Sequence, residues 1–182
     1  MITVILIVVA VVIAAALAYA ASKPDSFTVS RSATIAAPAE KIFPLIDDLR
    51  AQSAWSPFEK DPNMKRTYGG SPRGKGAVYE WDGNRQVGAG RIAIVESVPP
   101  ARIALQLEMM RPFKAQNTVE FALEPVSTGT KVTWSMRGRQ PFMAKLMGLF
   151  MNCDKMVGNQ FEEGLAKLKA LVESAPAAVA AE

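Results

Sequence analysis

The chain has 182 residues and a net charge of +4, and it contains one cysteine and no histidine. The absence of histidine excludes Ser-His-Asp and Cys-His catalytic arrangements and His-ligated zinc. A single cysteine can form neither an internal disulfide nor a cysteine-cluster metal site.

The first predicted element is an uncharged apolar run from Ile2 to Ala21. A helix needs about 20 apolar residues to cross a bilayer, so residues 1–22 are predicted to form one transmembrane helix, followed by a short linker at 23–26. A cleaved signal peptide is the alternative, because Ala16-Leu17-Ala18 and Ala18-Tyr19-Ala20 resemble signal peptidase sites. We favour the retained span, since no Lys or Arg precedes the run and the run is longer than the usual signal-peptide core.

Basic residues follow this run on its carboxyl side, beginning with Lys23 and Arg31. Because cytoplasmic flanks of membrane spans carry the excess of Lys and Arg, we expect a single-pass protein of a bacterial inner membrane with a cytoplasmic domain. Two later groups are Lys60, Lys65, Arg66, Arg73 and Lys75, and Arg111, Lys114, Arg137, Arg139 and Lys145. Such groups can contact anionic lipid headgroups or form a plain solvated face. No RNA-binding motif accompanies them, so no nucleic acid partner is expected.

The remaining chain is predicted to form one domain over residues 27–173, which is long enough to bury a sizeable core. It opens with an alternating strand from Phe27 to Ile35. A helix follows, with Pro38 in its first turn and Pro44 expected to start or kink its main part. The helix has an apolar stripe at Ile42, Phe43, Leu45, Ile46 and Leu49. The Pro- and aromatic-containing segment 55–62 is expected to be an ordered loop.

Residues 69–75 have the spacing of a phosphate-binding P-loop as far as Lys75. Gly76 stands where a P-loop needs a Ser or Thr for magnesium, and Ala77 to Trp81 alternates like a strand where a P-loop needs a helix. We therefore expect a Gly/Pro turn between two strands.

Alternation of apolar and polar residues then predicts a series of strands joined by short turns, which describes an antiparallel meander. The apolar positions are Ala77, Tyr79 and Trp81; Ile92 and Ile94; Ile103, Leu105, Leu107 and Met109; Val119, Phe121 and Leu123; and Val132, Trp134 and Met136. The glutamates between them are expected on a solvated outer face. These are Glu80, Glu108, Glu120 and Glu124.

From Pro141 to about Val172 the apolar spacing becomes helical, which predicts one long helix covering a face of the sheet in an α+β domain. Its apolar positions are Met143, Leu146, Met147, Phe150, Val157, Phe161, Leu165, Leu168 and Leu171. Cys153 lies within this pattern and is expected to be a packed thiol. Asp154 is the carboxylate expected to be partly buried, with Arg91, Arg137 or Lys131 as its partner. The Ala/Pro-rich segment 174–182 is predicted to be a disordered tail.

The order of strand, helix, six strands and long helix resembles the helix-grip fold of the START-like (SRPBCC) superfamily, in the branch of polyketide cyclase/dehydrase and lipid transport proteins. Segments similar to that branch are Ile35–Phe43, Trp55–Phe58, Tyr79–Trp81, Gly129–Trp134 and Phe161–Leu168. The resemblance covers about residues 27–173. It implies a curved antiparallel sheet wrapped around the C-terminal helix, with a deep cavity between them for an apolar or amphipathic small molecule.

Residues expected to line this implied cavity come from the loop, the strands and the first half of the long helix. They are Trp55, Tyr79, Trp81, Met109, Phe121, Trp134, Met143, Met147 and Phe150. Each would serve equally well as part of a packed core. No catalytic residue, metal or cofactor is expected, because no catalytic residue of the superfamily's cyclases or dehydratases can be carried over to this chain.

Three functions are compatible with the sequence. We favour a membrane-anchored protein that binds or transports a lipid or other small hydrophobic molecule. One alternative is a cyclase- or dehydratase-like enzyme with carboxylate or tyrosine acid/base groups, which would require polar groups converging in the cavity. The other is a protein-interaction module at the membrane, which a filled interior and a contiguous exposed apolar patch would favour.

Overall fold

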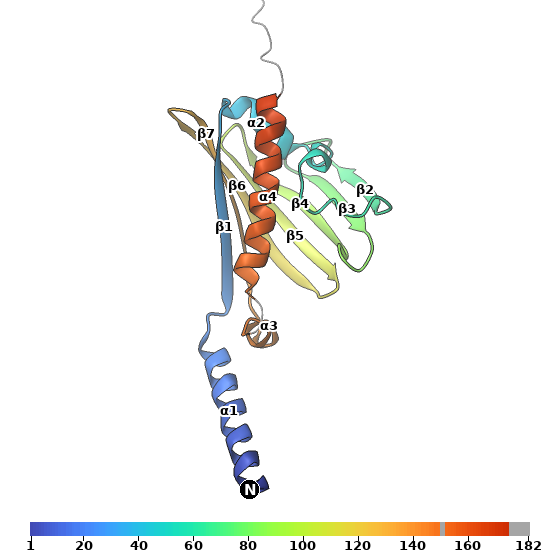
Figure 1. Ribbon diagram of the computed structural model, residues 1–182. Coiled ribbons are helices and arrows are strands. Elements are labelled where there is room, and N and C mark those ends of the chain that lie inside the picture. Colours follow the sequence, from blue (N-terminus) through green and yellow to red (C-terminus); the bar gives the residue numbers. More distant parts are fainter. Residues whose placement is uncertain (150–151, 175–182) are drawn as a thin grey trace, which may run out of the picture.

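The computed structural model describes residues 1–149 and 152–174 (Figure 1). Its helices are α1 (Ile2–Ser22), α2 (Ala39–Asp47), the 3-10 turn η1 (Ala51–Ala54), α3 (Phe142–Met147) and α4 (Cys153–Ser174). Its strands are β1 (Ser26–Ile35), β2 (Lys65–Gly70), β3 (Ala77–Asp82), β4 (Ala89–Val98), β5 (Arg102–Arg111), β6 (Ala115–Val126) and β7 (Gly129–Arg139).

The seven strands form one antiparallel sheet in the order β1-β7-β6-β5-β4-β3-β2. The sheet curves around α4, which packs mainly against β1 (Figure 1). This arrangement confirms the predicted α+β helix-grip fold. The glycine-rich segment that imitates a P-loop is the end of β2 and the turn into β3, as predicted.

The strand register brings the predicted apolar positions to one face of the sheet. Residues paired directly across antiparallel strands point to the same side. One row of partners runs Arg31, Trp134, Phe121 and Ile103. A second row on the same face, beyond the row that contains Val29, runs Phe27, Gly138, Asn117, Leu107, Ile92 and Tyr79. This is the concave face that α4 covers. The opposite face carries Glu80, which pairs with Arg91 at 3.4 Å, and Glu124, which pairs with Lys131 at 3.7 Å, so the predicted solvated outer face is confirmed.

The predicted single C-terminal helix is wrong: it is two helices, α3 and α4. The side-chain Oδ1 of Asn152 accepts a hydrogen bond from the backbone N–H of Lys155 at 2.9 Å, which is the bond an N-cap residue makes. Asn152 therefore starts a new helix inside an apolar pattern that reads as continuous. Ser174, expected in the tail, is the last residue of α4, and the rest of that predicted tail lies outside the described residues.

Pro44 does not start the second predicted helix, because α2 already begins at Ala39. Pro44 lies on the exposed side of α2, while Ile42, Phe43 and Ile46 are buried against the sheet domain.

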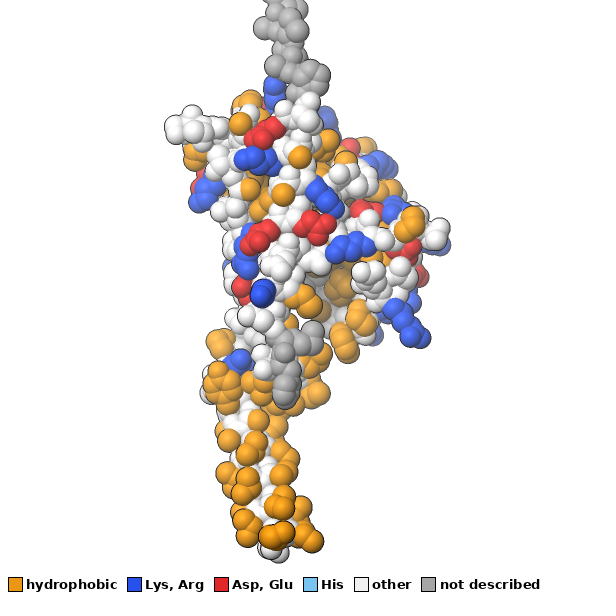
Figure 2. All heavy atoms as spheres, viewed as in Figure 1, with side chains coloured by type: hydrophobic (Ala, Val, Ile, Leu, Met, Phe, Trp, Pro, Cys, Tyr) orange, Lys and Arg blue, Asp and Glu red, His pale blue; other side chains and the backbone are white. Residues whose placement is uncertain are grey.

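The N-terminal helix α1 extends away from the sheet domain at the end where β1 begins (Figure 1). It is long and apolar enough to cross a membrane, and its most hydrophobic stretch is entirely unburied by the rest of the chain. Figure 2 shows hydrophobic side chains covering its visible surface from end to end.

Candidate functional site

The concave face is closed at one end and partly open at the other. The rows through Val29 and Trp134 are buried beneath α4. Toward the end where α1 leaves the domain, the same face carries five half-buried apolar side chains, here called the apolar rim. They are Phe27, Trp81, Ile92, Leu107 and Met109. The buried Asn117 lies in the same row as Phe27 and Leu107, so a polar group stands among them.

An aromatic cluster fills the closed end. The rings of Trp134 and Phe161 stack with centroids 4.2 Å apart. Trp55 meets Trp134 edge to face at 5.6 Å, and its indole N–H donates to the carbonyl of Leu45. Phe121 completes the cluster, 4.8 Å from Trp134. Such contacts are typical of a packed core.

Two glycines let α4 approach the sheet closely. A Cβ on Gly164 would lie 2.7 Å from Cζ3 of Trp134 and 2.9 Å from Cδ of Pro57. A Cβ on Gly158 would lie 2.0 Å from a guanidinium nitrogen of Arg31. Both positions therefore exclude a larger residue unless the neighbouring side chains move.

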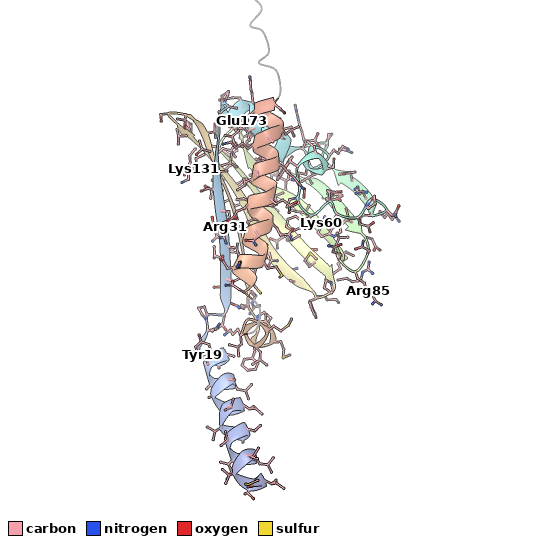
Figure 3. The ribbon with its side chains drawn as sticks, in the orientation of Figure 1. Tyr19, Arg31, Lys60, Arg85, Lys131 and Glu173 are labelled. Atoms are coloured by element: carbon pink, nitrogen blue, oxygen red, sulfur yellow. The ribbon has the colours of Figure 1, made fainter. Side chains whose placement is uncertain are left out.

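The expected burial of Asp154 is wrong, and so are its expected partners. The Asp154 side chain is 59% exposed, and it pairs with Arg31 at 3.1 Å. Arg31, which lies on β1 beside α4 (Figure 3), also donates from Nε to Glu162 at 2.8 Å. One guanidinium therefore binds two carboxylates of α4. Cys153 is exposed as well, because it is the first residue of α4 and does not lie within a longer helix.

A polar cluster borders the apolar rim at Tyr79. The Tyr79 hydroxyl donates to Oε1 of Glu59 at 2.7 Å, and Arg66 donates to Oε2 of Glu59 at 2.7 Å. Burial, and then the hydrogen bond to Glu59, raise the pKa of Tyr79 far above its ordinary value. Tyr79 therefore remains protonated at neutral pH and acts as a donor, and both oxygens of Glu59 are already occupied.

A groove of about 510 Å³ opens beside the first residues of β1. Phe27, Val29 and Leu149 supply its apolar lining, and Lys23, Gln140 and Asn152 supply polar groups. A second cavity of about 510 Å³ lies at the opposite end of the domain, between the start of α2 and the turn from β6 to β7. The first groove is the one that adjoins the apolar rim, through Phe27.

The predicted lining residues fall into three groups in the structure. Trp55, Phe121 and Trp134 are in the aromatic cluster, and Tyr79 is buried beside the rim. Trp81 and Met109 belong to the apolar rim. Met143 and Met147 lie on α3, away from the concave face, and are 65% and 43% exposed. Phe150 lies outside the described residues.

Sequence reasoning missed the groove and the Glu59 cluster. Both join segments far apart in the chain: β1 with the α3–α4 connection, and the loop after η1 with β2 and β3. For the Glu59 cluster, the available local signal was the predicted ordered loop around Pro57 and Pro62, which holds Glu59 beside Arg66 and Tyr79.

Comparison with solved structures shows the same fold in other proteins. Protein MLL2253 from Mesorhizobium loti superposes with a TM-score of 0.62 at 16% identity, over 83% of this chain and 100% of that one. Protein CV1439 from Chromobacterium violaceum gives 0.58 at 18% identity, over 83% and 99%. CalU16 from Micromonospora echinospora gives 0.52 at 18% identity, over 84% and 77%. A search of curated proteins found no match.

The family description that matches the sequence is "Polyketide cyclase / dehydrase and lipid transport", and the match spans residues 26–173. That span runs from the first residue of β1 to the penultimate residue of α4, and so includes the whole sheet and the helix it grips. The chain therefore belongs to the polyketide cyclase / dehydrase and lipid transport family.

Proposed function

We propose that this protein binds a lipid or other small hydrophobic molecule while anchored to a membrane by α1. The observation that carries the proposal is the change in burial along the concave face. The face is packed shut around Trp134, yet the rim from Phe27 to Met109 keeps apolar surface partly open at the end from which α1 leaves.

Anchoring is supported by the surface of α1. Its large apolar side chains from Ile2 to Ile13 are each about half exposed or more. Soluble monomers rarely expose contiguous apolar patches of more than a few hundred Å². A bilayer removes this surface from water. The Lys and Arg residues that follow α1 favour a cytoplasmic domain.

The chemistry of the groove favours an amphipathic ligand. Apolar and polar groups share the lining of the groove: Phe27, Val29 and Leu149 are apolar, and Lys23, Gln140, Asn152 and Asp154 are polar or charged. A ligand that fits it therefore needs both an apolar and a polar part. Transport by this protein means extracting such a molecule from the bilayer and holding it on the rim. The enzymatic alternative has less support, because Glu59 and Tyr79 already satisfy one another and Arg66.

The test is to purify the full-length protein in detergent and to identify bound molecules by extraction and mass spectrometry. Leu107→Trp fills the apolar rim, whereas Gln106→Trp adds the same ring on the opposite face of β5. Both variants keep α1 and therefore the same annular lipid. We expect a specific molecule to be depleted only in Leu107→Trp. Equal amounts in both variants, or no uptake of any hydrophobic probe by the native protein, would overturn the proposal.

A further inference from the structure

The length of α1 locates the membrane boundary relative to the domain. A helix of 21 residues at about 1.5 Å per residue is about 31 Å long, close to the thickness of the hydrocarbon core. Its ends therefore coincide with the two boundaries of that core. Tyr19 lies at the domain end of α1 (Figure 3), with Nζ of Lys23 5.1 Å from its ring centroid. Tyrosine and lysine are typical of this boundary.

The connection from α1 to the domain is short and fixed. Only Lys23, Pro24 and Asp25 separate α1 from β1. The carbonyl of Asp25 accepts a hydrogen bond from the backbone N–H of Gln140 at 2.7 Å. Its carboxylate accepts one from Nζ of Lys145 at 2.6 Å. These bonds hold α3 beside the end of α1, which α3 contacts (Figure 1).

Helix α3 buries its charged residue and exposes its apolar residues, which is the opposite of a helix that faces water. Its lysine, Lys145, is only 5% exposed, although the sequence suggested a basic surface residue here. Its apolar side chains point outward: Phe142 is 45% exposed, Met143 65% and Met147 43%. A helix that faces water exposes its charge and buries its apolar side chains. The exposed side of α3 therefore suits hydrocarbon.

A second apolar projection lies at the turn between β5 and β6, which points toward the same end of the domain (Figure 1). Phe113 is 69% exposed and Met110 is 50% exposed. Lys114 and Arg111 stand beside them, also exposed, and Arg111 pairs with Asp82 at the end of β3. Apolar side chains flanked by cations match a membrane surface with anionic headgroups.

We propose that α3 and the β5–β6 turn dock into the interface of the anionic bilayer that α1 crosses. The inference rests on the proposed membrane anchoring and adds a second contact to it. The docked domain turns the open end of its concave face, with the apolar rim, toward the lipid. A hydrophobic molecule then passes between bilayer and rim without crossing bulk water.

The proposal is tested with nitroxide spin labels on the full-length chain. The background is Cys153→Ser, and the protein is reconstituted in nanodiscs of phosphatidylcholine and phosphatidylglycerol. Labels are placed at Phe142→Cys and Phe113→Cys. Val126→Cys, an exposed site at the opposite end of the domain, is the aqueous control, and Ile7→Cys in α1 is the membrane control. Power saturation compares collisions of each label with oxygen, which enriches in lipid, and with a nickel chelate, which stays in water.

We expect the labels at Phe142 and Phe113 to favour oxygen, as the label at Ile7 does, and the label at Val126 to favour nickel. Labels at Phe142 and Phe113 that match Val126, while Ile7 favours oxygen, would overturn the docking and leave the anchoring intact. A label at Ile7 that favours nickel would overturn the anchoring and the docking together. Replacing Arg111 and Lys114 by glutamine should shift the Phe113 label toward water, and an unchanged label would contradict the role of anionic lipid.

Discussion

Gly164→Ala tests whether the space between α4 and the sheet is filled. Alanine is about 1 kcal/mol more favourable than glycine inside a helix, so propensity alone predicts stabilisation. The new Cβ would lie 2.7 Å from Trp134 and 2.9 Å from Pro57. Both neighbours are rings, and Trp134 is held against Phe161, so little room exists for relaxation. Overpacking costs about 1 to 3 kcal/mol, and at the upper end of that range the net destabilisation is about 2 kcal/mol.

The assay is urea unfolding of the full-length protein in detergent, followed by near-ultraviolet circular dichroism. Ala166→Gly, at an exposed position of the same helix, is the matched control and should cost about 1 kcal/mol through propensity alone. A Gly164→Ala variant that is more stable than the native protein would refute the reasoning. It would mean that Trp134 has free volume beside it, as a wall of an open cavity would.

Three further predictions concern other parts of the chain. Trp134→Ala should lower the free energy of unfolding by about 3 to 5 kcal/mol. Trp134→Phe should cost far less, because it removes an indole N–H that has no hydrogen-bond partner among the described residues. If Trp134→Ala instead leaves stability unchanged and abolishes ligand uptake, Trp134 is a cavity wall. The hydrogen bond and charge of Lys145 hold the pKa of Asp25 below its ordinary 3.8, so the contact persists above that pH and is lost as the pH falls through the lowered value. The protection factors of the α3 amides, which are corrected for the pH dependence of intrinsic exchange, should therefore fall at acid pH, and Asp25→Asn should show the lowered protection already at neutral pH. Cys153 is exposed, so a membrane-impermeant maleimide should label it only in disrupted cells if the domain is cytoplasmic; labelling of intact cells would place the domain outside.

The strand faces could be predicted because alternation along a strand is a local property. Tyr79, Leu107, Phe121 and Trp134 were assigned to apolar faces from their own neighbours, and the register joins those faces into one. The break between α3 and α4 was missed because the helical spacing of the apolar residues Leu146, Phe150 and Val157 continues across it in the sequence. The capping residue Asn152 was the available signal.

Long-range partners could not be predicted in the same way. Arg31 and Asp154 are 123 residues apart, and only the position of α4 over β1 brings them together. Whether a residue of the concave face is packed in the core or left half-exposed likewise depends on where α4 begins. The same residue type on the same face is therefore buried at Trp134 and half-buried at Trp81.

The three-residue connection at Lys23–Asp25 limits how far the sheet domain can move away from the end of α1. Fully extended, three residues span at most about 11 Å, and Asp25 is bonded to Gln140 and Lys145. If α1 is the membrane anchor that we propose, a domain held by so short a connection cannot cross the aqueous gap between two membranes. Under the proposed transport function, a molecule taken from that bilayer would have to be returned there or handed to a partner that comes to the same surface.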